Sequence, residues 1–252
     1  MGDESTFWAH LDVLRGCLLR VLLVVASAAV ASFCAKEMLF DVVLAPCHSD
    51  FVTYRLMGAD GFDLHLINTG LAEQMLIHIK VATCMGLLIA SPYVVYSLFG
   101  FVSPALYEHE RKATLGLTLS AYVMFVVGVL MNYFLIFPLT VRFLGLYQVS
   151  EDVDNMLTIS SYVDTLVMMS VAFGVVFEIP VLSWMMARMG VLRASWMTRY
   201  HRHAVVAILV VSAIITPTAD AFTLIVVSLP IWLLYEASIY IVRITNPNKR
   251  TL

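Results

Sequence analysis

CLLRVLLVVASAAVASFCA, residues 17–35, contains one charged residue and is long enough to cross a membrane as a helix. A membrane-spanning helix needs about 20 predominantly apolar residues to cross a hydrocarbon core of about 30 Å. Five further apolar stretches follow it, so we predict an all-α polytopic membrane protein. The six predicted spans cover residues 17–35, 75–101, 113–138, 161–189, 203–217 and 221–242.

The composition separates this chain from soluble proteins. Hydrophobic residues make up 61% of its 252 residues, charged residues make up 13%, and the mean hydropathy is +0.88. A soluble domain is roughly 45–50% apolar and about 25% charged. We therefore expect one six-helix transmembrane domain over residues 1–252. The first stretch has no clear small-residue cleavage site, so we expect it to remain as a span.

The four cysteines, Cys17, Cys34, Cys47 and Cys84, form no CxxC pair. We interpret them as small buried apolar residues. A disulfide involving Cys47 remains an alternative if its loop is extracytoplasmic.

The positions of Lys and Arg orient the predicted spans. With the N-terminus inside, eleven of the 15 basic residues fall on inner segments, and only Lys36, Arg55 and Arg142 fall on outer ones. Lys80 lies near the outer end of the second span, where its side chain can reach the headgroups. Both termini are therefore predicted to be cytoplasmic. The outer loops, 36–74 and 139–160, are long enough for short interfacial helices.

The last two spans are predicted to be short. Residues 203–217 reach only about 22 Å at 1.5 Å per residue, and the uninterrupted apolar part of 221–242 is also short. The tight turn TPTAD, residues 216–220, makes the two spans a helical hairpin. Short spans thin the surrounding bilayer or pack against longer neighbours.

Glu178 lies inside the fourth span, in FGVVFEIPV (173–181). A carboxylate in a bilayer costs at least about 2.5–3.5 kcal/mol, so it normally faces the bundle interior or a wet cavity. Pro180 removes a backbone hydrogen bond two residues later and is expected to kink the helix. The alternative is a purely structural carboxyl group within the bundle.

FVSPALYEHERK, residues 101–112, forms the predicted inner loop between the second and third spans. Its carboxylates, Glu108 and Glu110, can bind a cationic ligand, most tightly an arginine through bidentate hydrogen bonds. The alternative is a solvated loop that obeys the positive-inside rule, which explains Arg111 and Lys112 but not the two acids.

The remaining polar groups have simpler structural interpretations. Asp220 in TPTAD can cap the sixth helix, and Glu236 can mark the inner end of that helix. The basic segment 193–203 is expected to set topology and to contact anionic lipid. No GxSxG, HExxH, Walker or redox CxxC motif occurs, so we expect no catalytic residue, metal or cofactor.

Five short segments, in one order and spacing, resemble the TatC family, the multispanning receptor subunit of the twin-arginine protein translocase. They are HLDVLR (10–15), LAP (44–46), FVSPALYEHERK, FGVVFEIPV and TPTAD. The resemblance implies a concave, glove-like bundle of six helices in the bacterial cytoplasmic membrane. It also implies binding of twin-arginine signal peptides on folded precursors, assembly with TatA and TatB type single-span proteins and with other TatC copies, and transport that uses the proton-motive force.

The resemblance assigns roles to particular residues. Glu110 falls on the key acid of signal-peptide recognition, and Phe101, Leu106, Arg111, Lys112 and Arg15 match the same region. Glu178 and Asp220 match intramembrane or partner-contacting positions, to which we add Glu236, and Pro46 matches a structural position. The family pattern HLxELR has a glutamate where this chain has Val13. Asp12 is the candidate substitute, although one residue turns it by about 100° on a helix.

Two other classes remain open from the residues alone. A proton-coupled small-solute transporter would use Glu178 and Asp220 as relay groups, but such transporters often show internal repeats, and none is visible. An intramembrane enzyme would need a nucleophile that the sequence does not indicate. Neither class involves nucleic acid.

Overall fold

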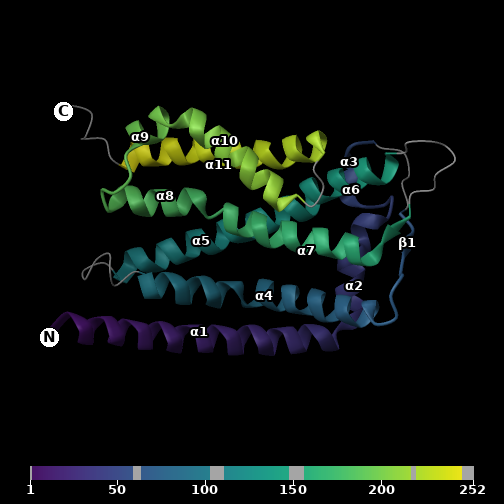
Figure 1. Ribbon diagram of the computed structural model, residues 1–252, viewed down its shortest axis with the longest axis horizontal. Coiled ribbons are helices and arrows are strands. Elements are labelled where there is room, and N and C mark those ends of the chain that lie inside the picture. Colours follow the sequence, from purple (N-terminus) through teal and green to yellow (C-terminus); the bar gives the residue numbers. More distant parts are fainter. Residues whose placement is uncertain (1, 59–63, 103–110, 148–155, 217–219, 246–252) are drawn as a thin grey trace. The chain divides into compact units, whose positions relative to one another are not determined.

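The computed structural model describes residues 2–58, 64–102, 111–147, 156–216 and 220–245. Side chains are described for 12–58, 64–97, 116–147, 156–216 and 220–245. The described residues are mostly helical (Figure 1). They form two compact units, Met1–Val42 with Ala72–Tyr122 and Val43–Leu71 with Val123–Leu252. The assignment of a single domain stays a prediction.

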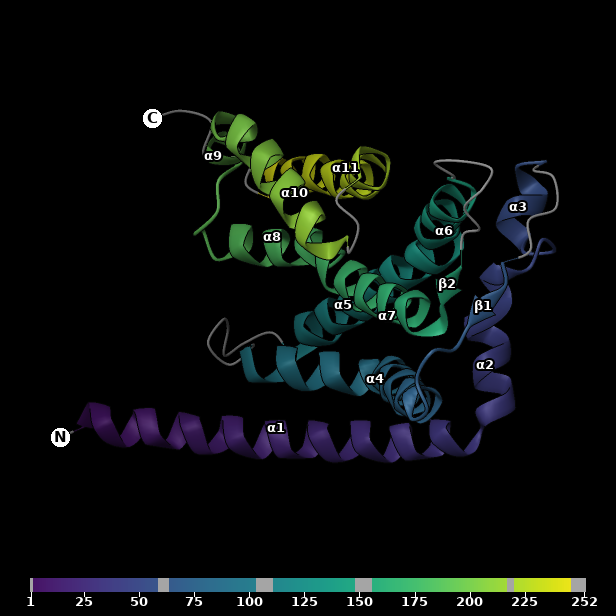
Figure 2. The same cartoon turned by 45° about the vertical axis from the view of Figure 1, so that its right-hand side comes forward.

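The first unit is built on two antiparallel helices, α1 (Gly2–Cys34) and α4 (Glu73–Val102). They run side by side in both ribbon views (Figures 1 and 2). Gly86 permits this close approach, because a Cβ atom at that position would lie 2.5 Å from the backbone nitrogen of Ala29. His78 of α4 stacks on Phe33 with ring centroids 3.9 Å apart. Close backbone contact therefore holds the first two spans together.

The second unit contains the later spans except for the beginning of α5, since residues 111–122 belong to the first unit. The third span continues from α5 through a π-helical turn into α6, and the fourth is split into α7 and α8. Helices α8 and α9 pack on α11 around Ala187, Met197, Ile239 and Val242. The helices are α5 (Arg111–Met131), η3 (Asn132–Ile136), α6 (Phe137–Leu146), α7 (Ile159–Val176), α8 (Ile179–Arg188), α9 (Ala194–Arg199), α10 (His201–Ile215) and α11 (Ala221–Thr245).

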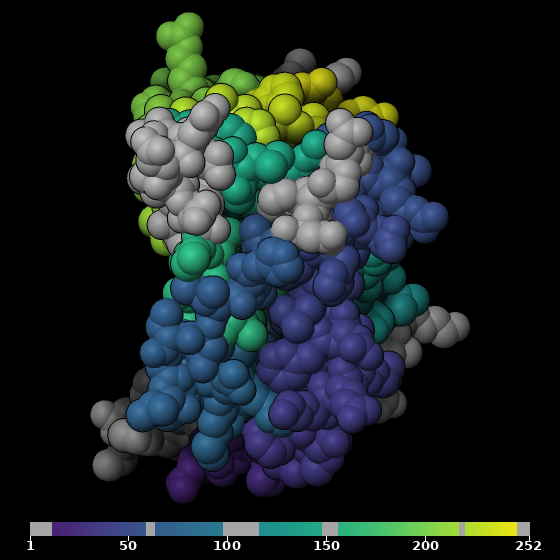
Figure 3. All heavy atoms as spheres, turned by 90° about the vertical axis from the view of Figure 1, so that its right-hand side faces the viewer, coloured from purple at the N-terminus to yellow at the C-terminus, as the bar shows by residue number. Residues whose placement is uncertain are grey.

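The predicted outer loops contain the expected short helices, α2 (Lys36–Leu44), η1 (Ala45–Cys47) and α3 (Val52–Leu56). Residues at the end of α3 are exposed, and Leu56 is 84% exposed. The space-filling view in Figure 3 shows the side of the molecule that lies at the right in Figure 1, where α3 is drawn. The two loops also pair with each other, because β1 (Leu66–Ile67) lies parallel to β2 (Leu157–Thr158). This strand pair was not predicted, since two residues per strand leave no alternating pattern to read.

Five described helical segments are long and apolar enough to cross a membrane, and His201–Ile215 is a shorter apolar helix. Together they correspond to the six predicted spans. The third span is longer than predicted and reaches Leu146, because Pro138 lies in the first turn of α6, where a missing N–H is tolerated. The predicted short length is confirmed for α10, with 15 residues, and is wrong for α11, with 25.

The four cysteines are free, so no disulfide involves Cys47. Cys47 is buried and its burial raises the pKa of its thiol, which keeps the group neutral. The interpretation of all four as buried residues is wrong for Cys34, which is exposed at the end of α1.

Candidate functional site

The predicted recognition segment, residues 101–112, connects the end of α4 to the beginning of α5. Helix α4 ends at Val102 and α5 begins at Arg111. Glu110, Glu108 and Leu106 lie outside the described residues. Phe101 is in the last turn of α4, and Arg111 and Lys112 are in the first turn of α5, with their backbone described.

Helix α1 places two further residues of the predicted recognition site, Asp12 and Arg15, beside the C-terminal end of α4. The thiol of Cys17 donates to the backbone carbonyl of Ser97 at 3.6 Å, which fixes the antiparallel register of α1 and α4. Asp12 lies five residues before Cys17, and Phe101 lies four residues after Ser97. Because the helices are antiparallel, both displacements of about 6–8 Å run in the same direction. Asp12 and Arg15 therefore lie level with the last turns of α4.

The departure at Val13 leaves an apolar side chain on this helix. Val13 is 60% exposed, and Asp12 and Arg15 are also exposed. Asp12 is the only acid at positions 12–34 of α1. It is the described carboxylate placed nearest to the family's glutamate, one position away.

Glu178 lies at the break in the fourth span. Helix α7 ends at Val176 and α8 begins at Ile179, with Pro180 in its first turn, which confirms the predicted interruption of the helix. Both carboxylate oxygens of Glu178 are buried, and neither has a hydrogen-bond partner among the residues that the structure describes. The break thus holds an acid in the bundle interior with its hydrogen-bonding capacity unused.

A buried hydrogen bond between the third and fourth spans was not predicted from the sequence. The side-chain amide of Asn132 donates to the Ser170 hydroxyl at 3.0 Å, and Asn132 is fully buried. Asn132 begins the π-helical turn η3, and such turns frequently occur at functional sites. An amide inside an apolar stretch was the available signal, since polar groups in spans normally face the bundle interior.

Asp220 and Glu236 have local partners. The carboxylate of Asp220 accepts the backbone N–H of Thr223 at 2.7 Å, so Asp220 caps α11, as the structural interpretation predicted. Glu236 lies 3.3 Å from the ring nitrogen of His201, and the two side chains are 40% and 38% exposed. This contact joins α10 to α11.

Pro46 accepts a hydrogen bond from another residue of the same outer loop. It is buried, and its backbone carbonyl accepts the hydroxyl of Tyr54 at 2.9 Å. The same hydroxyl lies 3.3 Å from the carbonyl of Pro138, and the Tyr162 hydroxyl donates to the Val43 carbonyl at 2.9 Å. These contacts tie the turn containing Pro46 to the third and fourth spans.

The apolar helices, the broken fourth span and the capped helical hairpin define a multi-pass α-helical membrane protein. The family model for the Sec-independent protein translocase protein TatC matches residues 9–230. The chain belongs to the TatC family.

Individual TatC proteins are similar in sequence to this chain over nearly its whole length. The TatC protein of Koribacter versatilis is 31% identical over 245 residues, which cover 97% of this chain and 88% of the relative. That of Desulforapulum autotrophicum is 33% identical over 247 residues, covering 98% and 87%. A crystal structure of the twin-arginine translocase receptor TatC superposes with a TM-score of 0.79 at 28% identity, covering 94% of this chain and 99% of that one.

Proposed function

We propose that this chain is the receptor subunit of a twin-arginine translocase and is not an enzyme. It binds the signal peptides of folded precursors. With TatA and TatB type partners and further copies of itself, it exports them across the bacterial cytoplasmic membrane, driven by the proton-motive force. The observation that carries this proposal is the similarity to the solved receptor over 94% of the chain. The segment FVSPALYEHERK supplies the chemistry.

Recognition of two arginines requires carboxylates at the cytoplasmic end of the spans. Glu110 is the principal acid, because a bidentate hydrogen-bonded pair distinguishes arginine from lysine. Phe101, Leu106, Arg111 and Lys112 complete the segment, and Asp12 with Arg15 contributes from α1. Asp12 lies one position from the family's glutamate, so its contribution is the smaller one.

The test is binding of a labelled twin-arginine signal peptide to the purified chain, compared with a twin-lysine peptide. The chain is expected to prefer the arginine peptide. Glu110→Ala is expected to weaken that binding roughly tenfold or more, since hydrogen bonds to charged groups contribute about 1.5–3 kcal/mol. Asp41→Asn is the control, because it also neutralises an exposed acid but lies on α2, outside the recognition segment. Equal binding of both peptides by folded wild-type chain would contradict the proposal.

In this proposal, partner helices dock on the helical hairpin of α10 and α11, at the short helix α10. Val206, Val210 and Ile214 form a stripe on α10, spaced by four residues and 60%, 54% and 66% exposed. Glu178, Asp220 and Glu236 supply polar contacts to partner or peptide. A photo-crosslinker at Val210 is expected to capture a TatB or TatA type protein, whereas one at Leu23 on α1 is not. Crosslinks that miss α10 and α11 would remove this docking site.

A further inference from the structure

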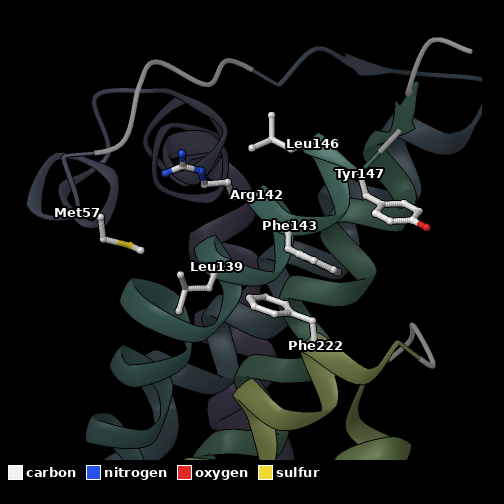
Figure 4. A pocket seen from close by; sticks show the side chains of 7 residues that line it. All are labelled: Met57, Leu139, Arg142, Phe143, Leu146, Tyr147 and Phe222. Carbon is white, nitrogen blue, oxygen red and sulfur yellow. The ribbon is translucent and has the colours of Figure 1, made fainter. Parts of the chain in front are cut away.

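A cavity of about 560 Å³ lies within the second unit, between the end of α3, the last turns of α6 and the start of α11 (Figure 4). Its size falls in the range of small-molecule sites, about 300–1,000 Å³. Phe143 and Phe222 form an aromatic wall, with their rings stacked at 4.1 Å between centroids. The rest of the lining consists of the half-buried Arg142 and of Met57, Leu139, Leu146 and Tyr147.

The length of the third span indicates the level in the membrane at which this cavity lies. Residues Gly116–Leu146 form a helical segment of 31 residues, which reaches about 46 Å at 1.5 Å per residue. This length exceeds a hydrocarbon core of about 30 Å, so one or both ends reach the headgroup region. Arg142 lies one turn before the outer end, and Tyr147 follows it, as expected at a membrane interface. With the orientation predicted from the charges, the cavity is expected to open at the level of the outer headgroups.

The described lining of the cavity carries positive charge. Among the described residues that line it, Arg142 is the only charged one. Among the residues that the structure describes, no carboxylate forms an ion pair with Arg142. The buried phenol of Tyr54 lies within electrostatic reach. Its burial raises its pKa, and the positive charge of Arg142 opposes that increase. A guanidinium in apolar surroundings calls for an anion that can accept several of its five donors.

We propose that this cavity binds an anionic phospholipid of the outer leaflet. The lipid phosphate accepts hydrogen bonds from Arg142, and an acyl chain lies along Phe143, Phe222 and Leu146. An apolar partner helix fits less well, because it would cover Arg142 and leave its donors unsatisfied. The site differs from the basic inner segment 193–203 in its membrane face and in having an apolar cavity. It does not depend on the receptor function.

The test is lipid binding to the purified chain by native mass spectrometry, with phosphatidylglycerol and phosphatidylcholine of identical acyl chains. Wild-type chain is expected to prefer phosphatidylglycerol. Arg142→Gln is expected to weaken its binding about fivefold, which corresponds to roughly 1 kcal/mol for one basic residue near an anionic surface. Lys36→Gln, which removes another outer cation, is expected to change nothing. Phe222→Ala is expected to weaken both lipids equally.

Three outcomes would overturn the proposal. They are equal binding of the two lipids by wild-type chain, unchanged binding by a folded Arg142→Gln variant, and displacement of the lipid by inorganic phosphate alone. A photo-crosslinker at Leu146 in membranes separates the occupants. A phospholipid adduct supports the proposal, and a protein adduct without lipid assigns the cavity to a partner.

Discussion

Asp220 shows how one side chain fixes the beginning of a helix. Its carboxylate accepts the backbone N–H of Thr223 at 2.7 Å, which satisfies a donor that the first turn of α11 cannot pair internally. Asp220→Ala is expected to lower the stability by about 1 kcal/mol, whereas Asp220→Asn keeps the cap and most of the stability. Thermal unfolding in detergent measures both. An equal loss in the two variants would mean that charge, not capping, is the important property.

Tyr54 offers a second prediction at this scale. Its buried hydroxyl bonds to the Pro46 carbonyl, so Tyr54→Phe leaves that carbonyl with one donor fewer. The expected loss is about 1–2 kcal/mol. Tyr240→Phe is the matched control, because Tyr240 is 63% exposed. Denaturant unfolding of the two variants checks the difference. An equal effect would remove Tyr54 as the support of Pro46.

Sequence reasoning located polar residues better than their partners. Glu178 and Asp220 stood out because acids are rare in apolar stretches, and the cap at Asp220 followed from its position before a helix. The pairing of Asn132 with Ser170, 38 residues apart, depends on how two helices meet. The contact of Tyr54 with Pro138 depends on how a loop folds back. No local pattern encodes either contact.

At the scale of elements, close packing of α1 on α4 gives a sharp prediction. Gly86→Ala places a Cβ atom 2.5 Å from the Ala29 nitrogen, which the two helices must move apart to accept. Overpacking of this kind costs about 1–3 kcal/mol. Gly16→Ala on α1 has no atom within 4 Å of the new Cβ, and alanine favours helix, so its stability should be unchanged or slightly higher. Unfolding midpoints in detergent compare them, and equal midpoints would refute the close contact.

The ends of the helices were predicted less accurately than the presence of the helices. Apolar content marks where a span can lie in lipid, but a helix continues wherever its backbone can bond. Helix α11 therefore runs through Glu236 to Thr245, and the third span continues past Pro138 after the π-helical turn. The break at Glu178 was predictable because Pro180 follows two residues later.

For the whole molecule, the count and order of the spans were predicted from hydropathy, whereas the orientation, predicted from charge, stays a prediction. The pairing of the outer loops through Leu66 and Leu157 was not predicted, because it joins segments 91 residues apart in sequence. The recognition segment was identified by resemblance, and its central residues, including Glu110, lie outside the described part of the chain. The register of α1 and α4 places Asp12 level with the last turns of α4, where Phe101 lies.

The orientation itself is the prediction that belongs to the whole molecule. With eleven basic residues inside and three outside, Arg55 on α3 should face the outer side and Arg199 on α9 the inner side, and both are exposed. In a chain whose native cysteines are replaced, a membrane-impermeant maleimide applied to cells is expected to label Arg55→Cys and not Arg199→Cys. Opening the membrane should expose the second site to the reagent. Labelling of Arg199→Cys in intact cells would invert the topology, and the proposed recognition segment would then face away from the precursors.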